Sequence, residues 1–130
     1  MNAKSRFGAK SASPPPATKV LSLYLSCDAR DFIVAQIVER FLEGPRRTQE
    51  TLYEEALVAY EQALIIEDGL LEGDRLEISS ADVPSALAIL EVALDKASLD
   101  LERRLVDERE GRRAVDAGRE IVRGLERRLR

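Results

Sequence analysis

One short segment of this chain alternates in polarity as a β-strand does, while the other apolar residues recur at helical spacing. The two faces of this segment, residues 19–25 (KVLSLYL), are formed by leucines on one side and by mixed residues on the other: Leu21, Leu23 and Leu25, opposite Val20, Ser22 and Tyr24. A strand of this length is not stable alone, so it has to pair with another strand. We expect the same segment of a second chain to be its partner, which predicts a dimer.

The remaining sequence is typical of a helical protein. Aromatic residues make up 5% of the 130 residues, Trp is absent, and Ala, Leu, Glu and Arg dominate. These straight-chain residues lose little rotamer freedom in a helix. The expected fold class is therefore mainly α: one short N-terminal strand, then an antiparallel helix pair and a long C-terminal helix.

The helix pair is predicted between residues 28 and 66. The first helix covers Asp28 to Leu42 and is apolar over more than half of its circumference, which indicates a buried or shared helix. Gly44 and Pro45 are expected to end it. Thr48 is expected to cap the second helix, which runs to about Ile66.

The C-terminal part is predicted to begin with a loop over residues 67–79 that contains a short extended piece at 76–78. A third helix starts at Ser80 or Asp82, with Pro84 tolerated in its first turn. Its apolar residues form a coiled-coil-like seam: Leu87, Leu90, Leu94, Ala97, Leu101 and Leu105. A polar stretch around Gly111 then predicts either one long bent helix or two helices joined near that residue.

These elements divide the chain into four predicted parts. Residues 1–18 form a disordered basic arm with three consecutive prolines, and residues 19–66 form a dimerisation core. The loop at 67–79 connects this core to residues 80–130, a helical region for oligomerisation or for binding a partner.

Catalysis is not expected of this chain. It contains no His, and Cys27 is its only cysteine, which excludes an intrachain disulfide, a Cys/His zinc site and a His-dependent base or triad. We predict no catalytic residue, no metal and no cofactor.

Charge is distributed unevenly, with basic ends and an acidic middle adding up to a net charge of −4. Contact with a polyanion is therefore expected through the ends or a local patch. The first residues lack the apolar stretch of a secretory signal, and no run of 18 apolar residues occurs. We expect a cytoplasmic protein that does not bind membranes.

The order strand, helix, Gly-containing turn, helix over residues 19–66 resembles the ribbon-helix-helix family of DNA-binding repressors and antitoxins. The matching segments are KVLSLYLS as the ribbon, residues 28–42 as the first helix, GPRRT as the turn, and LYEEALVAY in the second helix. The resemblance implies an obligate dimer whose two ribbons pair antiparallel and enter the DNA major groove.

The resemblance also implies roles for individual residues. DNA would be contacted by the outward face of the ribbon and by the turn, which binds a phosphate: Lys19, Val20, Ser22, Tyr24, Arg46, Arg47 and Thr48. The predicted dimer interface combines the inward leucines with the over-wide apolar surface of the first helix: Leu21, Leu23, Leu25, Ile33, Ile37 and Phe41.

Two functions follow as alternatives. The first is a small dimeric DNA-binding regulator whose C-terminal helix assembles dimers or binds a protein partner. The second is a non-enzymatic, all-α oligomeric structural or adaptor protein that does not bind DNA. Binding to duplex DNA at different salt concentrations separates the two, because phosphate contacts are strongly salt-dependent.

Overall fold

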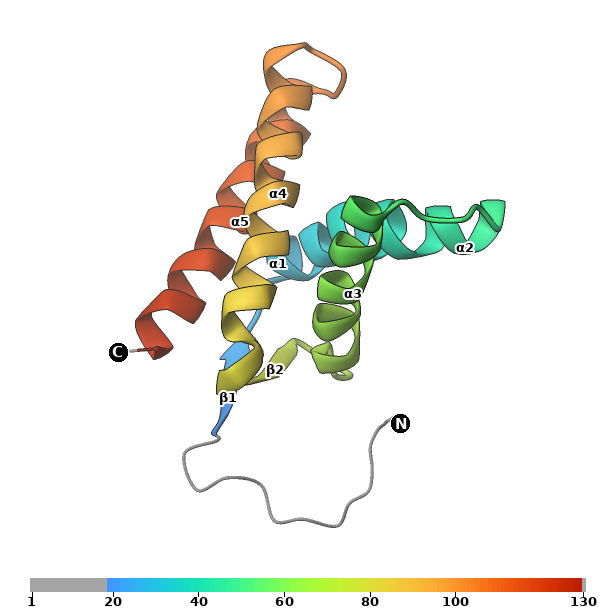
Figure 1. Cartoon of the computed structure of the whole chain (residues 1–130). Helices are drawn as coiled ribbons and strands as arrows, with labels where there is room; N and C mark the ends of the chain where they lie inside the picture. Colours follow the sequence, from blue (N-terminus) through green and yellow to red (C-terminus); the bar gives the residue numbers. More distant parts are fainter. Residues whose placement is uncertain (1–18, 130) are drawn as a thin grey trace.

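The computed structural model describes residues 19–129, and the N-terminal segment predicted to be a disordered arm lies outside them. The elements follow one another in this order (Figure 1): β1 (Val20–Tyr24), α1 (Cys27–Phe32), the π-helical η1 (Ile33–Glu43), α2 (Gly44–Thr48), α3 (Glu54–Gly69), β2 (Arg75–Ser79), the 3-10 turn η2 (Ser80–Asp82), α4 (Val83–Glu102) and α5 (Glu108–Arg128). The structure is thus mainly helical with a two-stranded sheet, which confirms the predicted fold class at this level.

The strand predicted near the N-terminus forms, but its partner is not the one expected. β1 pairs antiparallel with β2 of the same chain, from Val20 opposite Ser79 to Tyr24 opposite Arg75. β2 includes the extended piece predicted at 76–78. Its apolar residues Leu76 and Ile78 are almost fully buried and alternate with polar residues that are less buried, so the short strand gains a core-facing side from its own chain. The expectation that β1 takes its pairing from a second chain is therefore corrected.

The first helical stretch does not stop at Gly44 and Pro45, contrary to the prediction. α1, η1 and α2 follow one another without a break as far as Thr48. At the end of η1 the hydrogen bonds reach back five residues, and the Gly44 N–H donates to the carbonyl of Glu39. Pro45 lies in the first turn of α2, directly after η1, and proline is tolerated in a first turn because its missing N–H costs least there.

The next helix begins at Glu54 and not at the predicted Thr48. Gln49 has a left-handed backbone with φ of 56° and ends the preceding helix. The Thr48 hydroxyl donates to the carbonyl of Gly44 at 3.1 Å, so it turns back to its own helix. A short extended link over residues 49–53 therefore separates α2 from α3.

The predicted C-terminal helix is two helices, α4 and α5, which lie side by side in Figure 1. The chain turns at residues 103–107 and not at Gly111, which lies inside α5. A β-carbon on Gly111 would be 2.7 Å from Leu101 Cδ1, so this glycine permits close packing of the two helices near the turn. Leu105, the last residue of the predicted seam, lies in the turn and is exposed.

The core is shared by all the helices except α2. α4 contacts α5, α3 and η1, and α5 in turn contacts α1 and β1. The largest fully buried side chains come from both halves of the chain: Phe32, Ile33, Ile37, Leu42, Ile66, Leu76, Val83, Ile89, Leu90, Ile121 and Leu125. Residues 19–66 and 80–129 therefore pack into one hydrophobic core.

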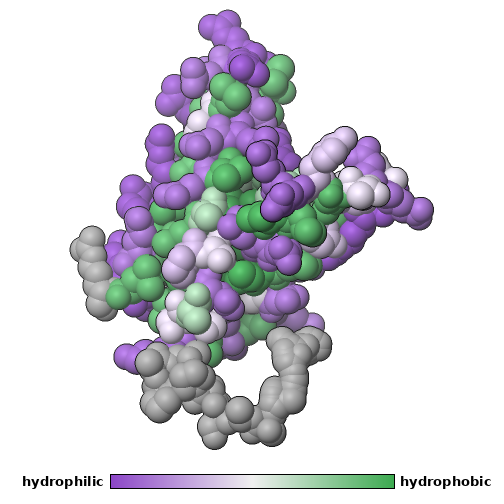
Figure 2. All heavy atoms as spheres, in the orientation of Figure 1, coloured by the Kyte–Doolittle hydropathy of each residue, from purple (hydrophilic) through white to green (hydrophobic). Residues whose placement is uncertain are grey.

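The first half of α3 and the link before it leave apolar side chains on the surface. Tyr53 is 86% exposed, Leu57 45% and Val58 48%. Hydrophobic side chains gather over α3 in Figure 2, whereas the end of the α4–α5 pair that carries the turn is largely hydrophilic. None of the helices described in residues 19–129 combines the length and the apolar character needed to cross a bilayer.

Candidate functional site

The two-stranded sheet has one covered edge and one open edge. On the outer side of β2, the Leu71 N–H donates to the carbonyl of Arg75 at 2.9 Å. Gly69, the last residue of α3, approaches the backbone of Glu77 so closely that a β-carbon there would overlap the Glu77 carbonyl oxygen. The chain itself therefore covers the edge of β2, and β1 provides the other edge.

Hydrogen bonds at both ends of the sheet show which backbone groups of β1 point outward. The Leu25 N–H donates to the Asp74 carbonyl at 2.6 Å, and the Ser80 N–H donates to the Lys19 carbonyl at 2.6 Å. In an antiparallel pair, hydrogen-bonded and non-hydrogen-bonded positions alternate, so the odd-numbered residues of β1 direct their backbone N–H and C=O groups toward β2. The even-numbered residues direct their N–H and C=O groups away from it.

The outward groups belong to Val20, Ser22 and Tyr24. None of them makes a backbone hydrogen bond to another part of residues 19–129. Unpaired N–H and C=O groups in a row are a template for pairing with another extended chain. β1 is therefore an edge that can accept a further strand.

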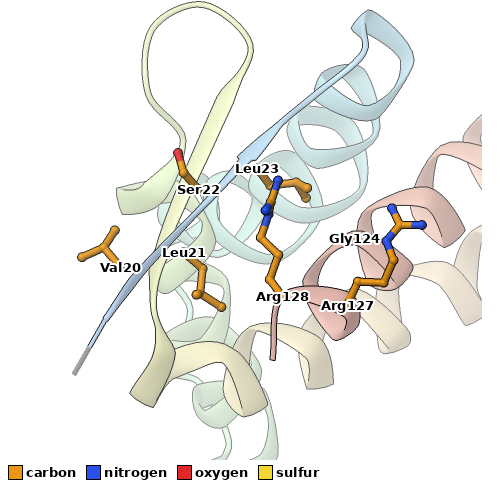
Figure 3. A pocket seen from close by; sticks show the side chains of 7 residues that line it. All are labelled: Val20, Leu21, Ser22, Leu23, Gly124, Arg127 and Arg128. Carbon is orange, nitrogen blue, oxygen red and sulfur yellow. The ribbon is translucent and has the colours of Figure 1, made fainter. Parts of the chain in front are cut away.

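The last turns of α5 lie beside this edge, and together they form a groove. Figure 3 shows Leu21 and Leu23 directed toward α5, and Val20 directed away from it. A β-carbon on Gly124 would be 2.8 Å from Leu23 Cδ1, so only glycine allows this close approach without a shift of Leu23. The groove has a volume of about 530 Å³ and is lined by Val20, Leu21, Ser22, Leu23, Gly124, Arg127 and Arg128.

The charge of the groove is positive. Arg127 and Arg128 are its charged lining residues, and neither forms a salt bridge within residues 19–129. Their sequence context explains this, because the residues three and four positions before them are Arg123, Gly124 and Leu125. Arg112, by contrast, pairs at 3.2 Å with Glu108 four residues earlier.

The ribbon residues predicted to contact DNA lie on the outward face of the sheet. Val20 and Tyr24 are strongly exposed, and Ser22 is half-buried between them. The opposite face carries the leucines, of which Leu25 is buried and Leu21 and Leu23 pack against the core. The predicted division of the strand into an outer and an inner face is confirmed.

The turn residues predicted to bind phosphate lie elsewhere. Arg46, Arg47 and Thr48 are in α2, which Figure 1 places at the opposite side of the molecule from β1. Within one chain, the structure therefore does not bring the ribbon and the turn residues into one continuous surface. Lys19 stays with the ribbon, where its backbone N–H donates to the Ser80 hydroxyl at 3.1 Å.

Arg46 is engaged by its own chain. Its guanidinium group donates to both carboxylate oxygens of Glu67, at 3.0 and 3.3 Å, and its Nε donates to the Tyr60 hydroxyl at 3.2 Å. The hydrogen bond to Glu67, followed by the one to Tyr60, raises the pKa of Arg46 above its ordinary value. This side chain attaches α2 to α3. Arg47, with Glu43 at 3.9 Å, is far more exposed.

The residues predicted to form a dimer interface are largely covered within one chain. Ile33 and Ile37 are 0% exposed, and Phe41 packs partly buried against the core. The wide apolar surface of this helix is explained by its neighbours α3, α4 and α5, which the sequence pattern did not assign to it. The structure corrects the assignment of Ile33 and Ile37 to the surface between subunits.

Sequence reasoning missed the groove because it missed the pairing of β1 with β2. The available signal was the alternation of Leu76 and Ile78 in a charged segment, together with two adjacent arginines, Arg127 and Arg128, that have no acid at helical pairing distance before them. Within residues 19–129, no group of three acidic or cysteine side chains is placed to hold a metal ion.

Comparisons with protein-family models, with curated proteins and with solved structures found no match to this chain.

Proposed function

We propose that this protein is a non-enzymatic adaptor that binds a partner polypeptide in extended conformation along the open edge of β1. The observation that carries the proposal is the row of unpaired backbone groups at Val20, Ser22 and Tyr24 beside α5. An extended segment that pairs with this edge adds a third strand to the sheet, which is a common mode of peptide recognition.

The groove provides both parts of such a site. Main-chain hydrogen bonds to the β1 edge supply affinity, each with a net contribution of about 0.5–1.5 kcal/mol. The side chains of a bound strand point alternately to the two faces of the sheet, and on one face they meet α5. Because the edge is only five residues long, we expect moderate affinity. The α5 side of the groove would select among peptide sequences through the side chains that face it.

Duplex DNA binding stays a prediction beside this proposal. Support for the adaptor comes from the pairing of β1 within its own chain and from the ion pair that occupies Arg46. The acidic middle of the chain also opposes approach to phosphates, whose neutralisation dominates DNA affinity.

The test is a selection of random eight-residue peptides on the full chain, followed by binding measurements on two variants. Ser22→Pro removes one outward N–H from the edge without removing a hydrogen bond to β2, whereas Ser22→Ala keeps the N–H and serves as the matched control. We expect the selected peptides to bind the wild type and S22A and to lose at least tenfold in affinity for S22P.

Duplex DNA at low salt is the second arm of this experiment. Selected peptides that bind S22P as tightly as the wild type would overturn the proposal. Retention of a 20-base-pair duplex that weakens steeply with salt would support the regulator instead. Circular dichroism of S22P checks that the variant retains its helical fold.

A further inference from the structure

We infer that the segment bound at the β1 edge is acidic, with Glu or Asp side chains at alternate positions that face Arg127 and Arg128. This inference rests on the proposed function, since it names the partner class for the same groove. It is carried by charge complementarity in the groove at the end of α5.

The two arginines are placed for such a role. Both side chains extend from the last turn of α5 at the groove, as Figure 3 shows, and both are exposed. The groove lining contains no acidic residue. The partial negative charge at a helix C-terminus favours arginine there, but it does not neutralise two guanidinium groups next to each other. Carboxylates on a bound strand would do so.

The geometry of an added strand sets the spacing of its acids. Side chains of a strand alternate between the two faces, so those that face α5 recur at every second residue. Leu21 and Leu23 mark this face on β1, because both are directed toward α5. A sequence with acids at every second position therefore presents all of its carboxylates to the side that holds Arg127 and Arg128.

Two other occupants, the N-terminal segment of this chain and a second copy of it, are less favourable because of their charge. Residues 1–18 contain Lys4, Arg6 and Lys10 and no acid, so the arginines repel them. A second copy that pairs edge to edge through β1 would bring two sets of Arg127 and Arg128 to one sheet. Repulsion between these like charges opposes pairing of two copies, whereas an acidic segment of another polypeptide is attracted to them.

The experiment uses three labelled probes that differ in charge only: acetylated and amidated peptides of sequence (Thr-Glu)₄, (Thr-Gln)₄ and (Thr-Lys)₄. The capped ends remove terminal charges, so that any preference arises from side chains. Fluorescence anisotropy with the full chain should give the tightest binding for (Thr-Glu)₄, about tenfold tighter than (Thr-Gln)₄, as expected of two exposed ion pairs. The preference should shrink as salt is raised.

Variants locate the effect. Arg127→Gln with Arg128→Gln should remove the preference, so that this variant binds (Thr-Glu)₄ no more tightly than it binds (Thr-Gln)₄. The matched control is Arg103→Gln with Arg104→Gln, an adjacent exposed pair in the turn at the other end of α5, which should keep the preference.

The outcomes separate this inference from the proposed function. Equal binding of (Thr-Glu)₄ and (Thr-Gln)₄, with both lost in S22P, would overturn the acidic partner and leave the added strand intact. Binding of (Thr-Glu)₄ that S22P does not change would overturn the added strand. If none of the three probes binds, or if the wild type sediments as a dimer that S22P dissociates, the acidic partner is overturned as well.

Discussion

Glycines on α5 decide how closely other elements approach this helix. A β-carbon on Gly118 would lie 2.8 Å from two ring atoms of Phe32 and 2.9 Å from Leu94 Cδ1. Phe32 is fully buried, and its rigid ring has little freedom to move away. At Gly124 the nearest atoms belong to the flexible end of Leu23, which is only half-buried. Substitution by alanine is therefore predicted to lower the free energy of unfolding at Gly118 and to raise it at Gly124.

Gly118→Ala should lower the free energy of unfolding by about 1–2 kcal/mol. Overpacking a core costs about 1–3 kcal/mol, which exceeds the gain of about 1 kcal/mol from replacing a helical glycine by alanine. Gly124→Ala should raise the free energy of unfolding by up to about 1 kcal/mol, because Leu23 can rotate away. Urea unfolding followed by circular dichroism measures both changes, and a loss of stability in G124A as large as that in G118A would show that β1 cannot yield.

At the scale of elements, the turn between α4 and α5 depends on a cap. The Asp107 carboxylate accepts hydrogen bonds from the N–H groups of Arg109 and Glu110, at 3.1 and 3.2 Å. These N–H groups have no partner inside the helix, so a side-chain acceptor starts the helix here. Arg104, with a left-handed φ of 57°, lies just past the end of α4. The two features place the turn several residues before Gly111.

Asp107→Ala should therefore destabilise the protein by about 1 kcal/mol, the usual cost of losing an N-terminal cap. Asp116→Ala is the matched control, because Asp116 lies in the middle of α5, is 79% exposed and has only a 4.0 Å contact with Arg119. Because alanine favours a helix interior more than aspartate does, this control should be at least as stable as the wild type. Thermal unfolding of both variants tests the prediction, and equal melting temperatures would mean that the cap does not hold the start of α5.

The elements differ in how far the sequence could predict them. Alternation in β1 and the helical spacing of leucines in α4 are local patterns, so the strand and the helix were predictable. Pairing of β1 with β2 is a long-range contact across more than fifty residues, and only burial of Leu76 and Ile78 against the helices makes this second strand stable. Pro45 was expected to end a helix, but it lies in the first turn of α2, where proline is tolerated, and no local pattern showed that α2 would follow η1 directly.

In the candidate site, too, local features were predictable and long-range contacts were not. The outward face of β1 was predictable from alternation, whereas the groove depends on where α5 ends relative to the strand. Arg46 was assigned to phosphate binding because it follows Gly44 and Pro45 in a presumed turn. Its ion pair with Glu67 forms only because α3 packs next to α2, and no local pattern contains that information.

At the scale of the whole molecule, the predicted self-association needs a different surface from the one that the sequence suggested. Ile33 and Ile37 are covered within one chain, but Tyr53, Leu57 and Val58 stay exposed at the start of α3. Exposed apolar side chains that lie near one another can mark an interface between chains. The homodimer therefore stays a prediction, now placed on α3 and independent of the groove at β1.

Val58→Asp should dissociate such a dimer, because a charge at the centre of an apolar interface loses its water without gaining a partner. Val92→Asp is the matched control, since Val92 is a helical valine of α4 with a similar exposure of 41%. In sedimentation at micromolar concentration, we expect the wild type and V92D to have twice the mass of the 14.5 kDa chain, and V58D to have the mass of one chain with unchanged helicity. A wild type of 14.5 kDa would contradict the dimer, and a dimeric V58D would mean that the chains associate through another face.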